Sequence, residues 1–204
     1  MELSELAQTR LIALVVGLVI AAVWALSIAS GRRRQARFAA LAQSFGSRVV
    51  REEKSLSRFP VEVDGRSFDV RYQLIGRGVG SGGWTPGWYV VTEVPLQGVS
   101  ELHSAEIRAR GKRPQSIDPH DPDFEKYFTV HDAGYPLRQG WLNTHVRGAI
   151  AHFYALELPL DPLGIEEGRL IHRANVPVQR LDGALLREIL TRQVAVANAL
   201  ESAL

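Results

Sequence analysis

The sequence contains no cysteine. Disulfide bonds, thiolate nucleophiles, thiolate zinc sites and cysteine-ligated iron–sulfur clusters are therefore excluded. A charge excess of either sign is also missing from most of the chain, because the residues from Phe38 onward include 19 lysines and arginines against 20 acids. The net charge of +2 thus reflects one local arginine cluster. This balance argues against nucleic acid as a partner.

Recognisable catalytic signatures are missing too. The chain has no G-x-S-x-G elbow, and Glu52-Glu53 and Glu166-Glu167 are adjacent pairs whose members point to different faces of a strand or lie on a turn. His145 and His152 are seven residues apart, whereas two ligands on one helix are usually separated by three or four. The acids in residues 118–123 lack the spacing of a calcium loop. We therefore predict no catalytic residues, no metal site and no cofactor.

An uncharged run without proline or amide side chains lies near the start of the chain: Leu11–Ser30, LIALVVGLVIAAVWALSIAS. As a helix it spans about 30 Å, the thickness of the hydrocarbon core of a bilayer. A cleaved signal peptide is the alternative, since SIAS resembles a cleavage site. However, its apolar stretch would be about 7–15 residues long, and Glu2 and Glu5 do not suit a positive N-region. We predict a retained transmembrane helix at residues 11–30.

The arginines around this run predict its orientation. One arginine, Arg10, precedes it, and four follow within seven residues: Arg32, Arg33, Arg34 and Arg37. Lysine and arginine beside a span stay on the cytoplasmic side. We therefore expect an inner-membrane or plasma-membrane protein with residues 1–10 outside and the large C-terminal part in the cytoplasm. The same four arginines are candidates for facing anionic lipid.

A basic juxtamembrane helix is expected over residues 31–46, either as a continuation of the membrane helix or as a restart after it. Phe38, Leu41, Ala42 and Phe45 recur with helical spacing, and Gly46 is a typical helix stop. No flexible Gly/Ser linker follows. Residues 47–204 are therefore expected to form one soluble domain close to the bilayer.

Beyond residue 47 the hydrophobic pattern alternates, as in strands. Residues 58–76 predict a β-hairpin around Asp64-Gly65. Residues 87–96 and 100–109 are expected to form a second pair joined around Gly98, and residues 124–130 a further strand. One apolar face of the hairpin is expected to comprise Val61, Val63, Phe68, Val70 and Tyr72.

Helical spacing returns at Leu142, and a last helix is expected from Gly183 to Leu204 with Asp182 as its N-cap. Residues 155–160 and 168–176 between them predict a short strand pair. The first stripe is Leu142, Val146, Ala149, Ile150 and Phe153, and the second is Leu186, Ile189, Leu190, Ala197, Leu200 and Leu204. The predicted fold class is α+β, with a mainly antiparallel sheet and two helices packed on one face.

A glycine-rich stretch matches the pattern G-x-G-x-x-G at Gly78, Gly80 and Gly83. In a dinucleotide-binding fold such glycines open a helix, but strand residues follow here, and the Lys-Ser/Thr ending of a phosphate-binding loop is missing. A hairpin loop is the simpler interpretation. Trp84 and Trp88 flank the stretch, which makes it a candidate binding loop if they are exposed. Alternatively, Trp88 packs as part of the next strand.

Basic residues also gather at the start of the long loop 110–123: Arg108, Arg110, Lys112 and Arg113. If this loop faces the bilayer, these residues are further candidates for contact with anionic lipid. If it faces away, they are an ordinary solvated run. Both interpretations stay open at the level of sequence.

Three hypotheses for function follow. The first is a non-enzymatic binding or scaffolding domain held at the membrane, with an unidentified protein partner. The second is a domain that binds anionic lipid or the membrane surface. The third is an unrecognised hydrolase or metal-dependent enzyme, for which the sequence offers no residues.

Overall fold

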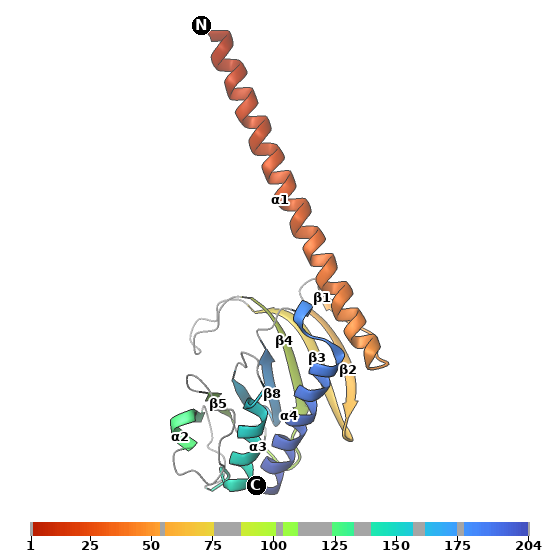
Figure 1. Ribbon diagram of the computed structural model, residues 1–204, viewed down its shortest axis with the longest axis vertical. Coiled ribbons are helices and arrows are strands. Elements are labelled where there is room, and N and C mark those ends of the chain that lie inside the picture. The colour runs from red at the N-terminus through yellow and green to blue at the C-terminus, as the bar shows by residue number, and fades with distance from the viewer. Residues whose placement is uncertain are drawn as a thin grey trace.

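One helix runs from the beginning of the chain into the body of the protein. In the computed structural model, α1 spans Glu2–Ser44, and its N-terminal part projects away from the other elements (Figure 1). The structure describes residues 2–53, 56–75, 87–100, 104–109, 124–132, 140–156, 162–174 and 178–203. Within these ranges, α1 is the one helix long and apolar enough to cross a membrane.

The end of α1 is a Schellman motif. Gly46 has a φ of +69°, its amide donates to the carbonyl of Gln43, and the amide of Ser47 donates to the carbonyl of Ala42. These bonds satisfy two carbonyls that the helix end leaves open. The prediction that the helix stops at Gly46 is confirmed.

The remaining elements of the described chain are the strands of one sheet, three short helices and one longer helix at the C-terminal end. The strands are β1 (Val50–Glu53), β2 (Leu56–Val63), β3 (Arg66–Ile75), β4 (Gly87–Pro95), β5 (Ala105–Ala109), β6 (Phe128–Asp132), β7 (Leu163–Glu166) and β8 (Arg169–Ala174). The helices after α1 are α2 (Phe124–Tyr127), α3 (Thr144–Tyr154), the 3-10 helix η1 (Val178–Arg180) and α4 (Gly183–Ala203). Among the described residues the strand order is β1-β2-β3-β4-β8-β7-β5-β6, and every pairing is antiparallel. The predicted α+β class with a mainly antiparallel sheet is confirmed.

Two tight hairpins use the same turn chemistry. Asp64 and Gly65, between β2 and β3, have φ values of 50° and 76°, as a type I′ turn requires. The predicted hairpin and its buried apolar face are confirmed. Glu167 and Gly168, between β7 and β8, have φ values of 51° and 70°. The expected pairing of residues 155–160 with residues 168–176 is wrong, because the partner of β8 is β7. Residues 155 and 156 form a turn after α3, and residues 157–160 lie outside the described residues.

The expected pairing of residues 87–96 with residues 100–109 is also wrong. β4 lies between β3 and β8, and Tyr89 to Val94 are buried on both faces of the sheet, as in a central strand. β5 instead lies between β7 and β6. The strand expected at 124–130 begins as α2, and β6 follows it.

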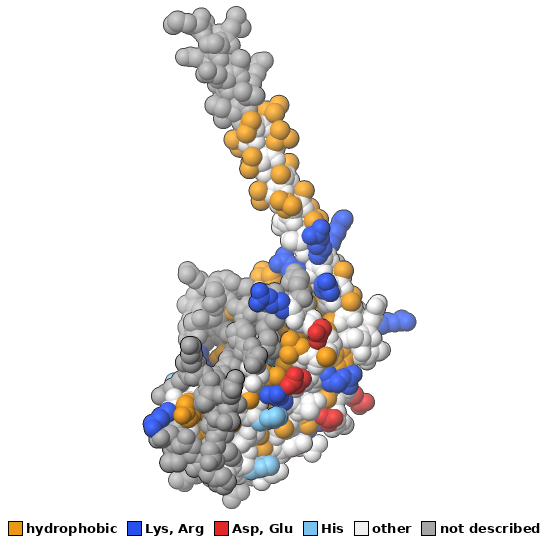
Figure 2. All heavy atoms as spheres, viewed as in Figure 1, with side chains coloured by type: hydrophobic (Ala, Val, Ile, Leu, Met, Phe, Trp, Pro, Cys, Tyr) orange, Lys and Arg blue, Asp and Glu red, His pale blue; other side chains and the backbone are white. Residues whose placement is uncertain are grey.

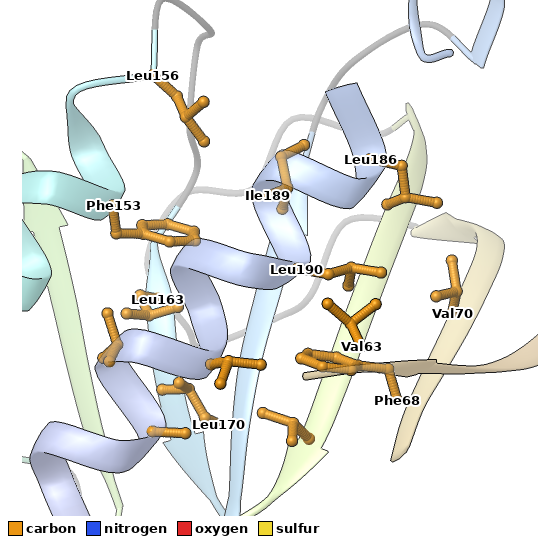
Figure 3. Close-up of a cluster of buried hydrophobic side chains, with 14 of the residues drawn as sticks. Val63, Phe68, Val70, Phe153, Leu156, Leu163, Leu170, Leu186, Ile189 and Leu190 are labelled. Carbon is orange, nitrogen blue, oxygen red and sulfur yellow. The ribbon is translucent and has the colours of Figure 1, made fainter. Parts of the chain in front are cut away.

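The core lies where α3 and α4 meet the sheet (Figure 3). Both helices begin at a side-chain cap: Asn143 Oδ1 accepts from Val146 N (3.0 Å), and Asp182 Oδ1 accepts from Leu185 N (2.8 Å), as expected. The described apolar positions of the α4 stripe are buried: Leu186, Ile189, Leu190, Ala197 and Leu200. Leu204 lies outside the described residues.

Polar and aromatic contacts join α3 and α4 to the two central strands. Gln193, fully buried on α4, donates from Nε2 to the carbonyls of Thr92 (3.2 Å) and Leu170 (2.9 Å), and its Oε1 accepts from Thr92 Oγ1 (2.6 Å). On α3, the ring of Phe153 meets the ring of buried His172 edge-on at 5.0 Å. Thr92 and His172 are opposite each other in the β4–β8 register. Both helices therefore contact the same side of these strands.

Candidate functional site

The C-terminal part of α1 is built into the domain. Phe38 is buried, and its ring centroid lies 5.0 Å from that of Phe59 and 5.5 Å from that of Tyr72. Tyr72 stacks on Trp88 at 4.8 Å, and the guanidinium of Arg34 lies 5.3 Å from the Trp88 ring centroid. The core therefore begins at Phe38, within residues 31–46, for which the sequence predicts a basic juxtamembrane helix.

The arginines at the foot of the apolar helix have different environments. Arg34 is half-buried over Trp88 and donates to Ser30 Oγ (3.5 Å), whereas Arg32, Arg33 and Arg37 are exposed. Figure 2 shows blue side chains gathered where the orange surface of the helix ends. The four predicted lipid-facing arginines thus comprise one packing residue and three exposed ones.

Arg34 also affects its aromatic neighbours. Burial raises the pKa of the Tyr72 hydroxyl above its usual value, and the positive charge of Arg34 offsets part of that rise. Trp88 is half-buried in β4 rather than presented on a loop. Gly78, Gly80, Gly83 and Trp84, the other members of the candidate binding loop, lie outside the described residues.

One end of the sheet lies beside the foot of α1. Arg34 of α1 contacts Trp88 at the start of β4. The N-terminal part of α1 therefore projects from the end of the sheet at which β4 starts (Figure 1). The strand registers place the end of β8, the start of β7 and the end of β5 at the same end. The apolar helix therefore departs from the same end of the sheet at which β3 ends, β4 starts and β5 ends. The residues there are Ile75, Gly87 and Ala109.

Of the four basic residues at the start of the long loop, the structure describes Arg108, and it does not lie next to the α1 arginines. Arg108 lies on β5, three strands from β4 and so about 14 Å across the sheet. It forms an ion pair with Glu106, and this hydrogen bond raises the pKa of the Arg108 guanidinium. Arg110, Lys112 and Arg113 lie outside the described residues.

Charged side chains occupy the side of the central strands opposite Thr92 and His172. Glu93, buried on β4, accepts hydrogen bonds from Arg71 (2.9 Å) on β3 and Arg169 (3.2 Å) on β8. Arg173 binds both carboxylate oxygens of Glu166, at 3.0 and 2.8 Å. These ion pairs border a hollow of about 340 Å³ over β3, β4, β8 and β7, to which Gln73, Val91, Glu167 and Ile171 also contribute.

The ion pairs continue across the neighbouring strands. Arg71 Nε donates to Asp69 (2.7 Å), and Arg58 on β2 lies 3.8 Å from the same carboxylate. A second hollow of about 430 Å³ lies here, and it shares Glu93 and Arg169 with the first. We call the surface formed by Arg58, Asp69, Arg71, Glu93, Glu166, Arg169 and Arg173 the charged face. No sequence motif indicates the charged face, because its members alternate with core residues on five separate strands.

Metal-ligating side chains do not gather in the described part of the chain. No group of three histidine, aspartate or glutamate side chains is placed there as around a metal ion. His145 and His152 are both exposed on α3, and residues 118–123 lie outside the described ranges. The arrangement that the structure does present is a charged face suited to salt-bridged recognition.

Comparison with known proteins gives no relative. No protein-family model matches the chain, no curated protein matches it, and no solved structure matches it.

Proposed function

We propose that the protein is a non-enzymatic binding module held at the cytoplasmic face of an inner or plasma membrane, with α1 as its single span. The observation that carries the proposal is the continuity of α1 from its apolar part to Phe38 in the core. A domain attached in this way has no flexible tether, so it presents its surfaces at a constant distance and angle to the bilayer. That property suits a protein that positions a partner beside a membrane.

The charged face is the surface that we assign to the partner. Arginine is enriched in protein–protein interfaces and forms directional paired hydrogen bonds with carboxylates. Each carboxylate of the charged face already accepts from an arginine, an arrangement that fits charge recognition better than proton transfer. The side chains of Arg169 and Glu166 remain 46% and 43% exposed, which leaves both signs of charge accessible to a partner.

The membrane part of the proposal is tested by two reporters fused after the C-terminus, one active only in the cytoplasm and one active only outside it. Four arginines follow the apolar run, so we expect activity from the cytoplasmic reporter alone. Activity from the external reporter alone would overturn the orientation, and release of the reporter from membranes would overturn the anchor.

The binding part is tested by a photocrosslinking residue at Gln73, which borders the first hollow, in the full-length protein in its native cells. We expect one discrete heavier species, which is lost when Arg169→Glu reverses a charge nearby. The matched control carries the crosslinker at Ala195, exposed on α4. Equal crosslinking from Gln73 and Ala195, or an unchanged species with Arg169→Glu, would contradict the assignment to the charged face.

A further inference from the structure

A groove of about 870 Å³ runs beside α1 where the apolar run gives way to the arginines. Its described lining comes from α1 alone: Leu26, Ala29, Ser30, Arg33, Ala36, Arg37 and Ala40. These residues extend for about 21 Å along the helix axis. The groove therefore begins within the proposed span and ends beyond it, at the level of the domain.

The groove lies on a part of α1 that the domain does not cover. Phe38, Leu41 and Ala42 are buried in the core, whereas Ala36 and Ala40 are exposed. Three of the lining residues have only a methyl side chain: Ala29, Ala36 and Ala40. The surface of the helix is therefore recessed between the longer side chains of Leu26, Arg33 and Arg37. A chain-like apolar molecule can lie close to the helix there.

The charges of the groove are positive and available. Arg33 and Arg37 are separated by four residues, so both guanidinium groups project from neighbouring turns of one side of the helix. No acidic side chain among the described residues is recorded in an ion pair with either of them, whereas the arginines of the charged face are paired with acids. Arg34, between them in sequence, lies over Trp88 instead. The groove thus offers two cations for one anion.

We propose that this groove is a binding site for one anionic phospholipid. The acyl chains lie along Leu26 and Ala29, and the phosphate lies between Arg33 and Arg37. The smaller surface at Ala36 and Ala40 accommodates the rest of the headgroup. This occupant follows from the order of chemistry along the helix, apolar within the span and cationic directly after it, which matches a phospholipid in a bilayer.

The arginines that are neighbours in the sequence are not equivalent for a lipid site in this groove. General attraction to an anionic surface depends on the number of positive charges and little on their position. A site in the groove depends on Arg33 and Arg37, and much less on Arg32, which does not line it. It also depends on the space above Ala36, which has no part in general attraction.

The test is native mass spectrometry of the full-length protein in mild detergent, titrated with phosphatidylglycerol or with phosphatidylcholine of the same acyl chains. We expect one tightly bound phosphatidylglycerol and about 25-fold weaker binding of phosphatidylcholine, whose headgroup has no net charge, given two arginines at about fivefold each. Arg33→Ala with Arg37→Ala is expected to weaken phosphatidylglycerol binding by about 25-fold. The charge-matched control, Arg32→Ala with Arg48→Ala, is expected to weaken it by less than about threefold.

A third variant, Ala36→Leu, fills the groove without changing the charge and is expected to lower phosphatidylglycerol binding as well. Equal losses in the two double variants, or full binding by Ala36→Leu, would overturn the site and leave only general attraction. A protein dimer that excludes lipid would overturn it in favour of a second copy of this chain. The inference rests on the proposed membrane insertion of α1, which the topology reporters test separately from lipid binding.

Discussion

The guanidinium of Arg34 lies over the ring of Trp88, 5.3 Å from its centroid, and joins the foot of the apolar helix to the first residues of β4. An arginine directly after the apolar run is thereby used as a packing residue of the domain. The cation–π contact itself contributes on the order of 0.5–1 kcal/mol at a partly exposed site. Burial of the Phe38 ring against Tyr72 and Phe59 contributes more, about 1.5–3 kcal/mol for a fully buried side chain of this size.

Replacing Phe38 by alanine is expected to lower the free energy of unfolding of the domain by about 3–5 kcal/mol, because the change leaves a cavity among aromatic rings. The measurement is near-UV circular dichroism of the full-length protein in mild detergent during a urea titration. The control is Gln43→Ala on the same helix, where the side chain is exposed and the midpoint should change little. An unchanged midpoint for Phe38→Ala would show that the foot of α1 is not part of the core.

The buried contact between Gln193 and Thr92 is expected to behave as a coupled pair. Gln193→Leu and Thr92→Val should each lower the free energy of unfolding by about 1–3 kcal/mol, because each leaves a buried polar group without its partner. The double variant should cost less than the sum of the single changes, since both members of the Thr92 Oγ1–Gln193 Oε1 hydrogen bond are then gone. Urea titrations of the four proteins give the coupling energy, and strict additivity would contradict the contact.

Acid sensitivity is expected from Glu201, near the end of α4. Burial by itself raises its pKa, but hydrogen bonds from Arg66 and from the Gln97 amide, together with the charge of Arg66, outweigh burial and place the pKa below its ordinary value. A carboxyl whose pKa is lowered by folding contributes stability above its unfolded pKa, and the contribution is lost as the pH falls through the folded pKa. Stability should therefore decline below about pH 4.5, the ordinary pKa of the group.

The Glu201→Gln variant should be less stable than the original protein at pH 7, and it should lose less stability between pH 5 and pH 3. Thermal unfolding followed across this pH range measures both effects. Glu188→Gln serves as the control, because Glu188 is an exposed residue of the same helix paired with Arg192. If both variants keep the same acid-dependent decline as the original protein, Glu201 is not its source.

Gly46 is expected to be intolerant of a side chain for reasons of backbone conformation alone. A Cβ built there meets no atom within 4 Å, but the φ of +69° is unfavourable for residues other than glycine. Gly46→Ala should cost about 1–2 kcal/mol, and Gly46→Asn less, because asparagine tolerates this conformation better. Gly31→Ala, within α1 and also without neighbours, should leave the urea midpoint unchanged or raise it. Similar effects at both glycines would contradict the Schellman motif.

Local patterns in the sequence predicted the features that depend on neighbouring residues. The apolar helix, its stop at Gly46, the hairpin at Asp64-Gly65 and the Asp182 cap each follow from residue types within a few positions of one another. Helical and alternating periods also identified most buried positions of the hairpin and of α4. These features are determined by backbone conformational preference and by burial of one face, which act over short distances along the chain.

Only the tertiary structure decided which strands pair and which side chains meet. β4 and β5 follow one another in sequence, yet β8 and β7 lie between them in the sheet, because pairing depends on the packing of both faces against distant segments. The charged face combines residues from five strands, and Arg34 and Trp88 are brought together across 54 positions of the chain. Such contacts arise when the whole core is buried at once, so no local pattern in the sequence specifies them.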